Sequence, residues 1–122
     1  QKRLTEAYDH ANILVGMYPD SLEAYVARAR VEIDLDMMAP AEHDLSAVLD
    51  KDSGDAEALL LRSKCRILLE KYDDAEADLH ELGALGYTDE ELPVLLKYCK
   101  KRKKVRESLL FARQNGKDGG NR

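Results

Sequence analysis

The strongest constraint on this sequence is an internal period of 34 residues. When the 122-residue chain is shifted by that distance, nine residue pairs are identical between the stretches 20–53 and 54–87. They are Glu23/Glu57, Ala24/Ala58, Arg28/Arg62, Ile33/Ile67, Leu35/Leu69, Ala41/Ala75, Glu42/Glu76, Asp44/Asp78 and Leu45/Leu79. A period of this length is the signature of a solenoid, in which each unit buries its apolar face only against its neighbours. The sequence therefore predicts a repeat array.

Within each period the apolar residues recur at three- and four-residue spacing, which predicts two helices per unit. In the first full unit they are Leu22, Tyr25, Val26, Ala29, Val31, Ile33 and Leu35, then Ala41, Leu45, Val48 and Leu49. Asp20 followed by Glu23 predicts the start of the first helix. Gly83 and Gly86 predict the end of the last helix of the second unit, because glycine readily adopts positive φ.

The composition supports a packed helical protein. Hydrophobic residues make up 44% of the chain and charged residues 35%, which is too apolar for a disordered segment. The chain has two cysteines, Cys65 and Cys99, which we expect to be reduced and packed. The sequence has no run of about 20 apolar residues, the length that a membrane-spanning helix needs, so we predict no membrane span. We therefore expect an intracellular protein, in the cytoplasm or alternatively in the nucleus, and the missing initiator Met suggests a fragment of a larger one.

The spacing of small and bulky residues resembles that of the tetratricopeptide-repeat (TPR) family, whose 34-residue unit is a helix–turn–helix. The family has small residues where the paired helices touch, and the matching positions hold Ala29 and Ala41, then Ser63 and Ala75. Bulky positions match as well, at Tyr25, Leu59, Leu45 and Leu79. The family's closing proline is present at Pro19 but is replaced by Ser53 and Tyr87 in the later units.

The resemblance implies an all-α, TPR-type solenoid with one half repeat, two full repeats and a long C-terminal capping helix. The expected parts are a second helix of a preceding unit (1–19), two TPR units (20–53 and 54–87), a basic capping helix (88–114) and a disordered tail (115–122). The expected apolar stripe of the capping helix is Leu95, Tyr98, Cys99, Arg102 through its stem, Val105 and Leu109. A solenoid needs such an end because its last unit has no further neighbour.

Members of the family hold an extended peptide on the concave face, against the first helix of each unit. The matching positions are Glu23, Val26, Arg30, Ile33, Glu57, Leu60, Lys64 and Ile67. These residues predict a groove for a peptide of mixed charge with an apolar anchor. Equally open is that they are ordinary solvated or packed residues, with a partner bound elsewhere. A chaperone-carboxylate clamp, known in part of the family, is not expected, since Glu23 and Glu57 would repel a carboxylate.

A second candidate surface is the basic run near the C-terminus. Before Lys97 there are 9 basic and 22 acidic side chains, and from Lys97 onward 10 basic and 2 acidic. The run consists of Lys100, Lys101, Arg102, Lys103, Lys104 and Arg106. It could be a solvated helix face, a docking strip for an acidic partner such as a neighbouring copy, or an import signal or nucleic-acid patch. Nucleic acid is the disfavoured partner, because only Tyr98 and Phe111 could stack on bases.

No pattern in the sequence predicts catalysis. His10, His43 and His80 lack metal-ligand spacing, and no nucleophile, base and orienting group can be assembled. We therefore expect no enzyme activity, no cofactor and no metal. The prediction is a protein–protein interaction module, a scaffold, adaptor or co-chaperone-like segment. The alternative is a nucleic-acid-associated or self-assembling adaptor that uses the basic helix.

Overall fold

The computed structural model describes residues 2–120, and their side chains as far as residue 116. All the regular structure in this part of the chain is α-helical. The helices are α1 (Lys2–Met17), α2 (Leu22–Asp34), α3 (Met38–Lys51), α4 (Ala56–Leu68), α5 (Tyr72–Ala84) and α6 (Glu91–Gly120).

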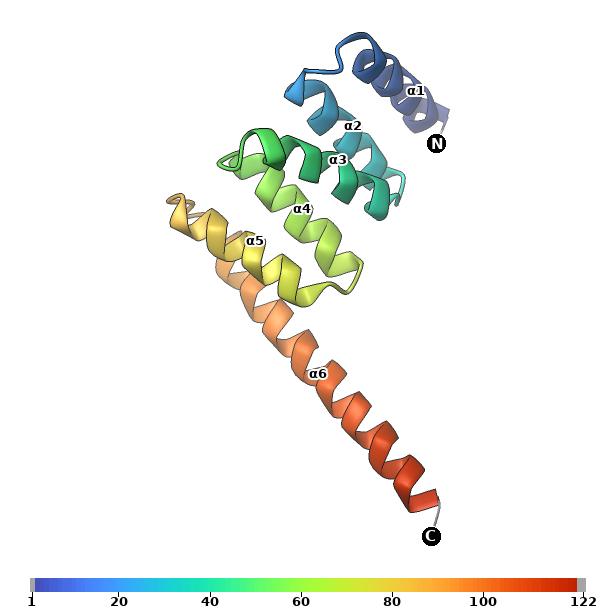
Figure 1. Cartoon of the computed structure of the whole chain (residues 1–122), viewed down its shortest axis with the longest axis vertical. Helices are drawn as coiled ribbons and strands as arrows, with labels where there is room; N and C mark the ends of the chain where they lie inside the picture. The colour runs from blue at the N-terminus through green and yellow to red at the C-terminus, as the bar shows by residue number, and fades with distance from the viewer. Residues whose placement is uncertain (1, 121–122) are drawn as a thin grey trace.

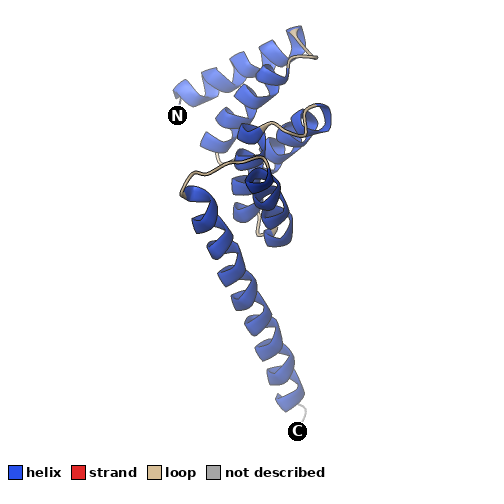
Figure 2. Ribbon diagram, turned by 90° about the vertical axis from the view of Figure 1, so that its left-hand side faces the viewer, coloured by secondary structure: helices blue, strands red, loops and turns tan. Residues whose placement is uncertain are grey.

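Each helix packs against the next one in the chain, so the helices form a stack that runs from α1 to α6 (Figure 1). The helices α2 and α4, which open the two units, also contact each other. The last helix leaves the stack and continues well beyond α5 as a single rod (Figure 2). The predicted all-α solenoid of helix pairs is confirmed.

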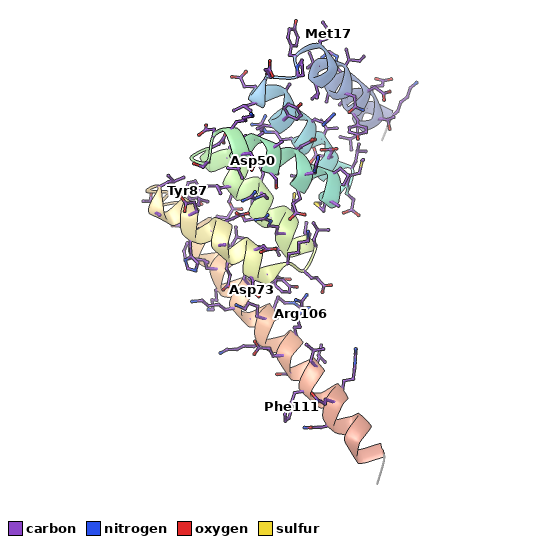
Figure 3. The ribbon with its side chains drawn as sticks, in the orientation of Figure 1. Met17, Asp50, Asp73, Tyr87, Arg106 and Phe111 are labelled. Atoms are coloured by element: carbon purple, nitrogen blue, oxygen red, sulfur yellow. The ribbon has the colours of Figure 1, made fainter. Side chains whose placement is uncertain are left out.

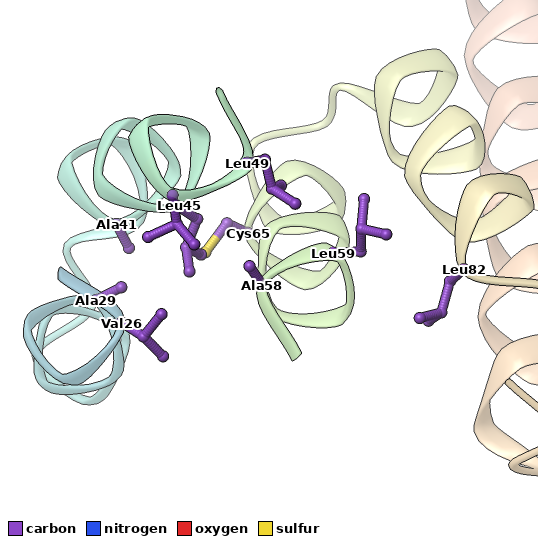
Figure 4. Packing of buried hydrophobic residues seen from close by; sticks show 10 residues of the cluster. Val26, Ala29, Ala41, Leu45, Leu49, Ala58, Leu59, Cys65 and Leu82 are labelled. Atoms are coloured by element: carbon purple, nitrogen blue, oxygen red, sulfur yellow. The ribbon is translucent and has the colours of Figure 1, made fainter. Parts of the chain in front are cut away.

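Small residues allow the paired helices to approach closely, as the sequence predicts. Ala29 of α2 and Ala41 of α3 are fully buried, and so are Ser63 of α4 and Ala75 of α5. Figure 4 shows Ala29 and Ala41 where α2 meets α3. A larger side chain there would push the helix axes apart.

The helix ends repeat with the same period, and one of them differs from the sequence-based expectation. Ser21, not Asp20, caps α2, with its hydroxyl accepting from the Ala24 amide at 3.2 Å. One period later the Asp55 carboxylate accepts from the Ala58 amide at 3.0 Å. Ser21 is the N-cap because it lies three residues before Ala24, the spacing at which an N-cap side chain reaches a free amide of the first turn. Gly86 has a φ of 91°, as expected of a glycine that ends a helix.

A buried ion pair also repeats once per unit. The Arg28 guanidinium donates to the Asp44 carboxylate at 2.7 and 2.8 Å, which joins α2 to α3. Arg62 donates to Asp78 in the same way at 2.6 and 3.0 Å, which joins α4 to α5. Such bidentate pairs fix the geometry of the two helices more than they stabilise them.

The helix α6 packs on α5 with a stripe that partly differs from the predicted one. Leu92, Leu95 and Leu96 join Cys99 there, whereas Tyr98 and Leu109, which the sequence predicts in the stripe, are exposed. The side of α6 that faces α5 is apolar as far as Cys99 and becomes basic one turn later, at Lys103. Lys103 lies on that side because α5 offers acidic side chains in place of an apolar surface.

The C-terminal end of α6 also differs from the expectation. The sequence predicts a disordered tail over 115–122, but the helix continues through Gly120. The backbone of 115–120 extends the helix that precedes it. Residues 121 and 122 of the expected tail lie outside the described residues.

Candidate functional site

The row of helices formed by α2 and α4 carries a hollow of about 440 Å³. It is lined by Leu22, Glu23, Val26, Ala27, Arg30, Asp55 and Glu57. Four of the eight groove candidates therefore border one hollow. Its walls are α2 from Leu22 to Arg30 and the start of α4, which lie side by side because the 34-residue period places equivalent helices next to each other.

The structure divides the groove candidates by burial. Glu23, Arg30 and Glu57 are exposed, and Ile33, Leu60 and Lys64 are half-buried. Val26 and Ile67 are only 7% and 9% exposed and belong to the two buried clusters. The aliphatic members of the set are thus mainly core residues with one edge toward the groove.

The charged members of the set pair with each other from one unit to the next. Arg30 of α2 forms an ion pair with Glu57 of α4. One period later the Lys64 ammonium of α4 lies 2.5 Å from a carboxylate oxygen of Glu91 in α6. These half-exposed pairs are worth at most about 1 kcal/mol each. Their main effect is that the bases along the row are neutralised by the protein itself.

The second pair shows that α6 stands where the first helix of a third unit would stand. Shifting the groove positions by two periods gives Glu91, Val94, Tyr98 and Lys101. Val94 is 64% exposed and Tyr98 46%. Glu91 and Val94 were not predicted as site residues, and Tyr98 and Lys101 were predicted in other roles, because the small positions of the repeat are lost in α6. The same two-period shift, applied to the ligand-facing positions of the first unit, was the sequence signal that could have identified these groove positions of α6.

The basic run of α6 is split between two faces. Three of its members contact the rest of the molecule. Lys103 lies 2.7 Å from both Asp73 and Glu76, and Arg102 donates to the Tyr72 hydroxyl at 3.4 Å. These contacts hold α6 on α5.

The third contacting member, Arg106, donates to the backbone oxygen of Glu70 at 2.7 Å. Its guanidinium also stacks over the Tyr72 ring, 5.2 Å from the ring centre. Figure 3 shows Arg106 and Asp73 at the level where α6 leaves the stack. Half of the predicted basic patch is therefore an internal clamp.

The part of the α6 surface outside its contact with α5 carries lysines. They are Lys97, Lys100, Lys101 and Lys104, which border a shallow hollow of about 370 Å³. Among the described side chains none forms an ion pair or a hydrogen bond with these lysines. Lys97 precedes the predicted run but lies with it. Farther along α6, Phe111 is 67% exposed and stands clear of the stack (Figure 3).

Comparison with known proteins agrees with this geometry. No protein-family model matches the chain. A stretch of 95 residues, 78% of the chain, is 32% identical to the TPR repeat-containing thioredoxin TDX of Arabidopsis thaliana and spans 25% of that protein. The solved Arabidopsis OM64 TPR domain has the same fold, with a TM-score of 0.76 at 23% identity over 82% of this chain and 83% of that one.

The chain belongs to the tetratricopeptide-repeat family. It spans about a quarter of the length of the curated relative that it matches. The two full TPR units of this chain are the helix pairs α2 with α3 and α4 with α5.

A buried acid interrupts the regular polar contacts between the TPR units. Glu32 of α2 is 3% exposed, and one of its carboxyl oxygens has no hydrogen-bond partner among the described residues. The other accepts from the Tyr8 hydroxyl of α1 at 3.4 Å. Burial first, and then the neighbouring Asp44 carboxyl, raise the pKa of Glu32 to about 8.

The equivalent residue of the second TPR unit carries the opposite charge. Arg66 donates to Asp78 at 2.9 Å and to Glu42 of the preceding unit at 2.8 Å. Sequence analysis did not single out Glu32, although the charge reversal between two equivalent repeat positions was visible. The contact between α1 and the first unit is therefore the one that carries a buried neutral acid.

The other groups that could carry chemistry are the cysteines and the clusters of acidic and histidine side chains. No cluster of three or more His, Cys, Asp or Glu side chains within the described part of the chain could hold a metal ion. Burial raises the pKa of the Cys65 thiol to about 11, and it raises that of Cys99 as well. Within residues 2–120 no helix is long and apolar enough to cross a bilayer.

Proposed function

We propose that this TPR chain is a non-catalytic interaction module, a scaffold or adaptor segment that holds an extended peptide of a protein partner along the row α2, α4 and α6. The hollow between α2 and α4 supports this proposal most directly. It is open, about 440 Å³ in volume, and bordered by both apolar and charged side chains. An extended peptide gains apolar contact and charge recognition together on such a surface.

The test is to find a ligand without assuming its identity and then to locate it. A displayed library of random linear peptides is selected on the chain, and the enriched peptide is titrated into ¹⁵N-labelled protein. We expect amide shifts at Glu23, Arg30 and Glu57, with little change on α3 and α5. Shifts confined to α1, α3 and α5 would show that the groove assignment is wrong.

A variant of the groove must keep the contact between the units. Reversal of Arg30 alone would leave Glu57 without its partner, so loss of binding could reflect a disturbed fold. The exchange variant Arg30→Glu with Glu57→Arg retains an ion pair while it inverts the charge pattern of the hollow. We expect it to lose the selected peptide at an unchanged melting temperature. Retained binding would place the peptide elsewhere.

The unpaired lysine face of α6 favours a second candidate function. In this alternative the chain is an adaptor whose basic helix docks on nucleic acid or on the acidic units of another copy. Phosphate binding weakens steeply with added salt, and self-association raises the mass with concentration. Titration of a duplex DNA probe across a salt series and sedimentation across a concentration series test the two versions. We propose a cytoplasmic or nuclear location, which microscopy of a tagged full-length protein would check.

A further inference from the structure

The free charges of the row α2, α4 and α6 have opposite signs at its two ends. At the α2 end, Glu23 is exposed and forms no ion pair with any described residue. Asp55 accepts a hydrogen bond from the Ala58 amide but has no basic partner within the described part of the chain. The base nearby, Arg30, is already bound to Glu57. This end of the row is therefore anionic.

The α6 end of the row has free bases and exposed apolar groups. Val94, Lys97, Tyr98 and Lys101 follow each other at three- and four-residue spacing, so they share one side of α6. The Lys64–Glu91 pair joins the first turn of α6 to α4, and Val94, Tyr98 and Lys101 continue from Glu91 along this side of the helix. Because Lys97 and Lys101 have no acidic partner among the described residues, this end is cationic.

The middle of the row is electrically neutral. Its charges are the pairs Arg30–Glu57 and Lys64–Glu91, which cancel within the protein. Apolar side chains adjoin these pairs: Leu22, Val26 and Ala27 of α2 line the hollow that Arg30 and Glu57 also border, and Leu60 of α4 is half-buried. A ligand that crosses the middle gains most from apolar contact.

We infer that the row recognises a bipolar segment of a partner protein, with a basic residue at one end, apolar residues in the middle and an acidic residue at the other end. This inference rests on the proposed function and adds the chemistry of the ligand. Packed helices lie about 10 Å apart, so two helix-to-helix steps put α2 and α6 at least about 20 Å apart. An extended chain covers that distance with about six residues. The base lies at Glu23 and Asp55, and the acid at Lys97 and Lys101.

The probes are four pools of fluorescein-labelled decapeptides with a degenerate centre of Ala, Leu, Val and Tyr. The first pool has two Lys at one end and two Glu at the other, in both orders; the others have Lys, Glu or Ser at both ends. Binding is followed by fluorescence anisotropy at 0.15 M salt. We expect the bipolar pool to bind about 5-fold or more tightly than either single-sign pool, since each exposed charge contact contributes modestly.

Charge reversals at the two ends should redirect the preference in opposite ways. Glu23→Lys cancels the net negative charge of the α2 end, because Asp55 remains, and should shift the preference from the bipolar pool toward the acidic pool. The double variant Lys97→Glu with Lys101→Glu should weaken the bipolar pool about 10-fold and favour the basic pool. Matched controls are Glu81→Lys on α5 and Lys51→Glu on α3, which are exposed and outside the row. They should leave the order of the pools unchanged.

The outcomes separate this inference from the proposed function. If the basic pool binds as tightly as the bipolar pool, or if reversal of Lys97 and Lys101 changes nothing, α6 is not part of the recognition surface. The inference is then overturned, while a library peptide that maps to α2 and α4 would still support the groove. If library peptides map to the other face of the stack, the groove itself fails.

Discussion

Replacement of the buried acid Glu32 by glutamine should stabilise the protein, and more so at higher pH. The folded state holds Glu32 with a pKa of about 8, against an ordinary value of 4.5. The groups that face it are Tyr8 of α1, Arg28 of its own helix and Asp44 of α3. Arg28 and Tyr8 lower the pKa of Glu32, but burial and Asp44 outweigh them. The side chain is therefore neutral in the folded protein near pH 7.

The sign of the pH dependence follows from proton binding. Between pH 4.5 and 8 the folded state keeps the proton on Glu32 while the unfolded chain releases it. The free energy of unfolding therefore falls as the pH rises, by about 1.4 kcal/mol per unit. The full interval would cost about 5 kcal/mol, and relaxation around the site reduces that figure. Asp44, whose pKa is lowered, loses its contribution only below this window.

Glu32→Gln keeps the shape of the protonated acid, and its amide can donate to Asp44. We expect urea unfolding to show little difference from wild type at pH 5, and a gain of about 2–4 kcal/mol at pH 9. The melting temperature at pH 9 should rise by about 10 °C. Glu81→Gln, at an exposed acid of α5, is the control and should change neither value. An equal stability difference between Glu32→Gln and wild type at pH 5 and pH 9 would refute the assigned ionisation.

Four further perturbations test other parts of the structure. Ala75→Trp should destabilise the fold by about 3 kcal/mol in urea unfolding, because Ala75 is fully buried, whereas Ala77→Trp on the exposed side of α5 should not. A normal melting temperature for Ala75→Trp would contradict the repeat register. Glu70→Gly and Asp36→Gly should each stabilise the protein by up to about 1 kcal/mol in thermal unfolding, since both residues have a φ of 61°, and destabilisation would show that their side chains matter. Lys103→Glu should speed hydrogen exchange in α6 by removing the contacts with Asp73 and Glu76. Lys104 has no partner among the described residues, so Lys104→Glu should leave the exchange of α6 slow. Cys65 and Cys99 should react with a thiol reagent only after denaturation, because both are buried with raised pKa values, and rapid labelling of the native protein would contradict their burial.

The repeat made most of the fold predictable. Positions such as Ala29 and Ala41 are required wherever two helices of a pair touch, so the period alone identified the core. The same reasoning applied to caps would have chosen Ser21, since Asp55 stands one period later in the same role. The C-terminal helix was less predictable. Its stripe ends in Lys103, and only the acids of α5 explain why a base lies there.

The candidate site was predicted as a set of positions, and its electrostatics were not. Arg30 and Glu57 both stood among the expected groove residues, but nothing in the sequence indicated that they bind each other. Tyr98 was assigned to the packed stripe of α6 and lies instead 46% exposed. The difference arises because a three-to-four residue period defines a face of a helix, but not which neighbour covers that face.

The sequence by itself determined the helices, their pairing and the residues buried between them. These properties depend on contacts within one 34-residue unit, and the residues that make those contacts recur in the sequence every 34 residues. Only the tertiary structure decided which charges cancel, which lysines of α6 remain free and that α6 extends the row of α2 and α4. Those outcomes depend on the offset and tilt between units, which no local pattern encodes, because an ion pair needs two side chains within a few ångströms.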